Sequence, residues 1–74
     1  MSGSAVWAIT PAENPGEEPL RELFIAAELD KVKAMIAVSK IVDIDVVVEI
    51  AGPVSARTIE ILALSPGQTF NASA

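Results

Sequence analysis

Residues 41–64 read IVDIDVVVEIAGPVSARTIEILAL, and this stretch carries the clearest conformational pattern in the chain. Apolar residues fall on every second position from Val42 to Ile50, and acidic residues occupy three of the alternate positions. This period of two is typical of a β-strand with one buried face. The GPVS segment at 52–55 has the composition of a turn, and so short a connection joins antiparallel neighbours. We therefore predict an antiparallel β-hairpin with strands at about 41–51 and 56–65.

Residues 18–40 predict one long helix, because they are strong helix formers with no glycine or proline after Pro19. At 100° per residue, the apolar side chains form two stripes on nearly opposite sides of this helix. A surface helix needs only one such stripe, so the second stripe predicts a contact with another chain. The second stripe consists of Ile25, Leu29, Val32 and Ile36. An alternative is that 32–38 is a strand and that the helix ends near Asp30.

The two ends of the chain have simpler patterns. The apolar run at 5–10 predicts a short strand, in which Trp7 is a core or interface anchor or, alternatively, an aromatic platform for a ligand. Three prolines and three glutamates predict a loop over 11–19. Residues 1–66 then form a single small domain, and 67–74 a flexible tail with Phe70 as a docking anchor.

These elements predict an α+β fold in which the hairpin and the N-terminal strand pack on the long helix. The order strand, helix, strand, strand at about seventy residues is similar to that of the dodecins, which are small flavin-storing shells of twelve copies. The resemblance is one of length and element order and carries no motif. Dodecins stack flavin on a tryptophan of the middle strand, whereas Trp7 belongs to the first strand here, so the resemblance supplies no site residue.

Composition excludes several classes of function. Ten acidic and five basic residues give a net charge of −5, which disfavours binding to nucleic acid. The chain has no cysteine or histidine, so it has no disulfide and no ordinary soft-metal site. Asp43, Asp45 and Glu49 could ligate a hard cation, but no glycine-bearing calcium loop surrounds them, and solubilising charges on a strand explain them without a metal. We predict no catalytic residue, metal or cofactor, and therefore no enzyme.

No apolar run exceeds five residues, against roughly 20 for a membrane helix, and the N-terminus does not resemble a signal peptide. We therefore expect no membrane span and a location in the cytoplasm or within an assembled particle such as a virion or shell.

The amount of apolar side chain is the main functional indication. Half of the residues (51%) are apolar, yet a domain of this size buries on folding only about 60% of the surface that its unfolded chain exposes. This excess predicts a structural subunit that self-associates. The predicted interface comprises Ile25, Leu29, Val32, Ile36, Val47, Leu62, Leu64 and Trp7. One alternative is an oligomeric ligand-binding or regulatory module with a pocket between subunits, although no motif indicates a small molecule. Another is an adaptor that adds a strand to a larger partner.

Overall fold

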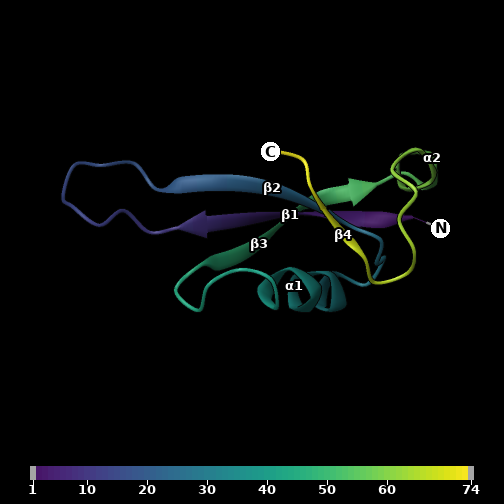
Figure 1. Ribbon diagram of the computed structural model, residues 1–74, viewed down its shortest axis with the longest axis horizontal. Helices are drawn as coiled ribbons and strands as arrows, with labels where there is room; N and C mark the ends of the chain where they lie inside the picture. The colour runs from purple at the N-terminus through teal and green to yellow at the C-terminus, as the bar shows by residue number, and fades with distance from the viewer. Residues whose placement is uncertain (1, 74) are drawn as a thin grey trace.

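The computed structural model describes residues 2–73 as an α+β fold, which confirms the predicted class (Figure 1). This part of the chain forms one four-stranded antiparallel sheet and two short helices. The strands follow the order β3-β1-β2-β4 across the sheet, so β1 is central and β3 is an edge strand. In chain order the elements are β1 (Gly3–Thr10), β2 (Leu20–Ala26), α1 (Lys31–Ser39), β3 (Val47–Val54), α2 (Ala56–Ile61) and β4 (Thr69–Asn71).

β1 and β2 form a long hairpin whose connection projects from the body of the molecule (Figure 1). β1 contains the predicted strand at 5–10, and residues 11–19, where a loop is expected, form no helix or strand. We call residues 11–19 the arm. At its tip the N–H of Glu17 donates to the carbonyl of Asn14 (3.3 Å). Pro15 and Gly16, with φ +87° at the glycine, occupy the two central positions, as expected for a type II turn.

The predicted long helix over 18–40 is wrong, because residues 20–26 form β2 and the helix α1 begins only at Lys31. The alternative of a strand at 32–38 is also wrong. β2 has apolar side chains on both of its faces, and this pattern resembles the two stripes of a buried helix. Backbone pairing with β1 on one side and β4 on the other selects the strand, despite good helix propensity.

The start of α1 is fixed by its N-cap residue. The Asp30 carboxylate accepts hydrogen bonds from the backbone N–H groups of Val32 (2.9 Å) and Lys33 (3.1 Å). These bonds satisfy donors that lack a partner in the first turn of any helix. The helix therefore begins after Asp30, and the residues before Asp30 are not part of it.

The predicted hairpin of 41–51 with 56–65 is wrong as well. β3 pairs antiparallel with β1 instead, and residues 56–61 form α2. Gly52 and Pro53 do not form a turn but lie inside β3, where an edge position tolerates the missing N–H of proline. Ser55 is the N-cap of α2, and its hydroxyl accepts from the N–H of Thr58 (3.2 Å).

α2 ends in a left-handed residue that is not glycine. Ala63 has φ +54°, and its N–H donates to the carbonyl of Glu60 (2.9 Å). The N–H of Leu64 donates to the carbonyl of Ile59 (3.2 Å). This pair of bonds is the Schellman arrangement, in which glycine is the usual residue at the position of Ala63.

The segment after Gly67 completes the sheet. β4 pairs with the end of β2, with Phe70 opposite Ile25. Two backbone hydrogen bonds join this segment to Ala27. The Ala27 N–H donates to the carbonyl of Gln68 (2.8 Å), and the Ala27 carbonyl accepts from the N–H of Gly67 (3.0 Å). The predicted flexible tail therefore contains an edge strand, and the observed element order differs from the one on which the resemblance to dodecins depends.

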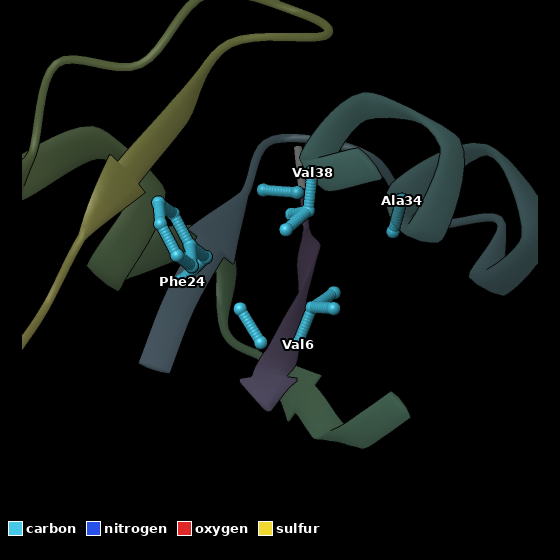
Figure 2. Close-up of a cluster of buried hydrophobic side chains, with 6 residues drawn as sticks. Val6, Phe24, Ala34 and Val38 are labelled. Carbon is cyan, nitrogen blue, oxygen red and sulfur yellow. The ribbon is translucent and has the colours of Figure 1, made fainter. Parts of the chain in front are cut away.

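The core lies between α1 and one face of the sheet. Figure 2 shows Val6 and Phe24 from the strands pointing toward Ala34 and Val38 of α1. Val6, Ala34 and Val38 are fully buried. Ala8 and Ala26 complete this buried cluster. The partly buried side chains that pack against it are Met35, Val42, Val46, Val48 and Ile50.

Candidate functional site: an uncovered sheet face and a groove beside α1

The sheet face opposite α1 carries a continuous set of apolar side chains. Successive strand residues point to opposite faces, so the neighbours of Val6 and Phe24 in sequence point away from the helix. The register places Ile25 between Ala5 and Phe70, Trp7 beside Leu23, and Ile9 beside Val47. We call this surface the open face, and its large apolar residues are Trp7, Ile9, Leu23, Ile25, Val47 and Phe70.

α1 packs on the other side of the sheet and leaves the open face uncovered. α2 lies at one end of the sheet (Figure 1). There its buried Ile59 lies beside Gly3, which has the same orientation in β1 as Trp7. Val47 and Phe70 are the most accessible members, with 53% and 43% of their surface exposed. The other four are half-buried by their neighbours on the same face. Charged side chains on this face, Arg21 and Glu49, lie in β2 and the edge strand β3.

A groove lies between α1 and the segment that follows α2. It has a cavity volume of about 810 Å³. The lining combines apolar side chains with three charged residues, Lys33, Lys40 and Glu28. Lys33 and Lys40 share one side of α1 because seven residues are almost two helical turns. The apolar lining includes Ile36, Ala37, Ile41, Leu62 and Leu64.

The eight residues predicted to form an interface fall on two surfaces and a helix start. Trp7, Ile25 and Val47 lie together on the open face. A second set, Ile36, Leu62 and Leu64, lines the groove. Leu29 and Val32 are exposed at the beginning of α1 and join neither surface.

Sequence reasoning missed three members of the open face. These are Leu23, Ile9 and Phe70, none of which is among the eight residues predicted to form the interface. The alternation of Trp7 and Ile9 within the first strand was the available signal. Placing Phe70 requires knowing that β4 pairs with β2, which no local pattern indicates.

Asp43 and Asp45 no longer share a strand face with Glu49, because both aspartates lie in the exposed loop before β3. Among residues 2–73 no group of three or more acidic side chains is arranged to hold a metal ion.

No match to the chain is found among protein families, curated proteins or solved structures. Within the described residues, no helix is long and apolar enough to cross a membrane.

Proposed function

We propose that this chain is a non-enzymatic structural subunit that self-associates through the open face. The observation that carries the proposal is the outward set of Trp7, Ile9, Leu23 and Ile25. An antiparallel sheet that turns one face to water normally alternates apolar and polar residues. The central strands β1 and β2 instead carry large apolar side chains on both faces. Such strands are typical of a sheet that is covered on both sides.

The shape of the monomer supports this proposal. Its accessible surface is 4929 Å², whereas a compact monomer of 7.7 kDa exposes about 4,300 Å². Its radius of gyration is 12.6 Å, against about 11 Å for a compact chain of this length. The molecule is therefore more extended than a self-sufficient domain of its size.

The mechanism of association is the packing of two open faces. Two twisted sheets stack about 10 Å apart in a β-sandwich, which would leave α1 on the outside of each copy. The three long strands offer a footprint of about 27 × 14 Å, or about 400 Å². That footprint lies within the range of about 300–600 Å² for the largest apolar patch of a monomer, and such patches are often functional.

The expected energy fits a reversible dimer. Complete burial of a large apolar side chain contributes about 1.5–3 kcal/mol. About half of this remains for Val47 and Phe70, and about a third for the four less exposed residues of the open face, so two copies contribute about 7–14 kcal/mol. Loss of translational and rotational freedom costs about 4–15 kcal/mol and offsets much of this gain, so the expected affinity is weak to moderate. A repeated assembly such as a virion, shell or filament would keep the local concentration high enough for this contact.

The test is sedimentation of the wild-type chain and of a Val47→Thr/Phe70→Ser double variant at micromolar concentration. These two side chains are the most accessible on the open face, so the substitutions disturb the monomer core least. We expect dimers or larger species for the wild type and a loss of dimer in the variant. Ile44→Thr is the matched control, because Ile44 is fully exposed in the loop before β3 and lies on neither surface. A folded wild-type monomer at all concentrations would refute the proposal.

A second candidate function is that of an adaptor that adds its edge strand to a partner. β3 supports it, because this strand of eight residues lies at the edge of the sheet and leaves one side without a neighbouring strand. Co-purification from the native source distinguishes the two candidates, since an adaptor would retain a different chain and a structural subunit would retain copies of itself.

A further inference from the structure

The arm is an acidic segment that projects from the rest of the described residues, 2–73 (Figure 1). Every residue from Glu13 to Arg21 is exposed. Glu13, Glu17 and Glu18 give its tip three negative charges. The type II turn is reinforced by a hydrogen bond from the side-chain amide of Asn14 to the Glu17 carboxylate (2.8 Å). The three prolines limit the conformations of the arm further. The arm is thus partly ordered and exposed, as a segment that binds another molecule would be.

The groove beside α1 has the complementary character. Lys33 and Lys40 lie about 10 Å apart along the helix and both reach the groove. With Glu28, the third charged lining residue, the groove has a local charge of +1 in a chain whose net charge is −5. The apolar lining of the same groove, which includes Ile36 and Leu64, suits proline rings and an aliphatic side chain.

We propose that the arm of one copy docks in the groove of a second copy. Its glutamates would lie against Lys33 and Lys40, and the prolines and Leu20 would cover the apolar lining. Leu20, at the base of the arm, is 61% exposed. The order of the turn reduces the conformational entropy that docking removes. This inference rests on the proposed self-association but uses a surface separate from the open face.

The occupant must be a second copy rather than the same chain. The molecule measures 41 × 19 × 17 Å, and the arm forms one end of the long axis (Figure 1). α1 and the segment after α2 lie toward the middle and the other end (Figure 1). The arm therefore extends away from its own groove. An arm-to-groove contact joins two different surfaces, so it produces rings or open chains and does not stop at a dimer. Combined with pairing of open faces, it would link dimers into a larger assembly.

Charge reversal on both sides of the contact provides the experiment. The arm variant is Glu13→Lys/Glu18→Lys, which leaves the Asn14–Glu17 hydrogen bond intact. The groove variant is Lys33→Glu/Lys40→Glu. Exposed ion pairs are individually weak, but reversal replaces two attractions by two repulsions, so we expect each variant alone to associate about thirtyfold or more weakly. An equimolar mixture of the two variants should recover association, because the reversed charges attract each other again.

The matched control is Asp43→Lys/Asp45→Lys, which changes the net charge as much as the arm variant does but alters an exposed loop outside both surfaces. Light scattering and sedimentation at low salt measure the size distribution, and circular dichroism verifies the fold of each variant. Growth beyond the dimer that is lost in both reversed variants, restored by mixing and retained in the control supports the arm-to-groove contact. An unchanged size distribution in the arm variant, or no recovery on mixing, overturns it.

Failure of this contact and failure of the open-face proposal give different results. If only the arm contact is wrong, charge reversal has no effect and Val47→Thr/Phe70→Ser still dissociates the dimer. If only the open face is wrong, that double variant associates like the wild type, and charge reversal abolishes association.

Discussion

Replacing Ala63 with glycine should stabilise the protein, because Ala63 occupies a conformation that favours glycine. Its φ of +54° lies in the left-handed region. An L-residue with a Cβ atom pays about 1–2 kcal/mol there, and glycine does not. Glycine also makes the unfolded chain more flexible, which costs about 0.4–1 kcal/mol. The difference is a net stabilisation of about 0.5–1 kcal/mol, or a rise in Tm of about 2–8 °C for a domain of this size.

Thermal unfolding followed by circular dichroism measures this effect. Every variant should be compared at two matched protein concentrations, because self-association raises the apparent Tm. Ala37→Gly is the control: Ala37 also lines the groove, but it lies inside α1, where glycine costs about 1 kcal/mol and should lower Tm. Both substitutions remove the same methyl group from the same groove, so opposite signs isolate the backbone effect.

A fall in Tm for Ala63→Gly similar to that for Ala37→Gly would refute the reasoning. That result would mean that residue 63 has an ordinary right-handed or extended conformation. The Schellman end of α2 would then not exist, and the strand over 56–65 expected from the sequence would again be plausible. Removal of this one methyl group therefore tests α2, the helix that the sequence did not predict.

Three other regions give testable expectations. Gly3→Ala should destabilise the protein by about 2–3 kcal/mol in urea titration, because a Cβ atom would overlap a backbone carbonyl of β2 and lie 2.7 Å from Cδ1 of Ile59. Gly52→Ala is the control, because a Cβ atom at Gly52 meets nothing within 4 Å. An equal loss of stability in both variants would contradict this account. Asp30→Ala should cost about 1 kcal/mol through loss of the α1 cap, with Asp30→Asn retaining most of the stability. Fluorescence of Trp7 should shift to longer wavelength on dilution if the open face becomes wet, and a constant spectrum across the dissociation range would count against pairing of the open faces.

Local signals were sufficient for the first part of the chain. The apolar run at 5–10 and the prolines of 11–19 specify a strand and a loop through residue type alone, and both are present in the structure. β2 could not be assigned in the same way. Its sequence LRELFIA suits a helix by propensity, and its hydrogen bonds to β1 and β4, which are separate from it in sequence, make it a strand.

α2 was missed for a different physical reason. Its start and stop signals are both ambiguous in sequence. Serine is favoured in turns and at helix N-termini alike, so Ser55 does not specify a helix start. Ala63 occupies the position after the helix where glycine usually marks the end. Thr58, Ile59, Glu60 and Ile61 alternate polar and apolar, which favours a strand when no stop signal is seen. One of these, Ile59, becomes buried against Gly3.

The sequence predicted part of the candidate surface correctly from a helix that does not form, and the reason is physical. Ile25 was expected to face a neighbour because a helix over 18–40 would have apolar side chains on two sides. The true strand β2 has the same property, with Leu23 and Ile25 on one face and Phe24 on the other. A segment that is apolar on both sides needs two covering layers whether its period is 3.6 or 2. The chain supplies α1 as one layer, and the need for the second layer does not depend on the secondary structure. The open face therefore predicts self-association whether residues 20–26 form a helix or a strand. The Val47→Thr/Phe70→Ser variant tests this prediction directly.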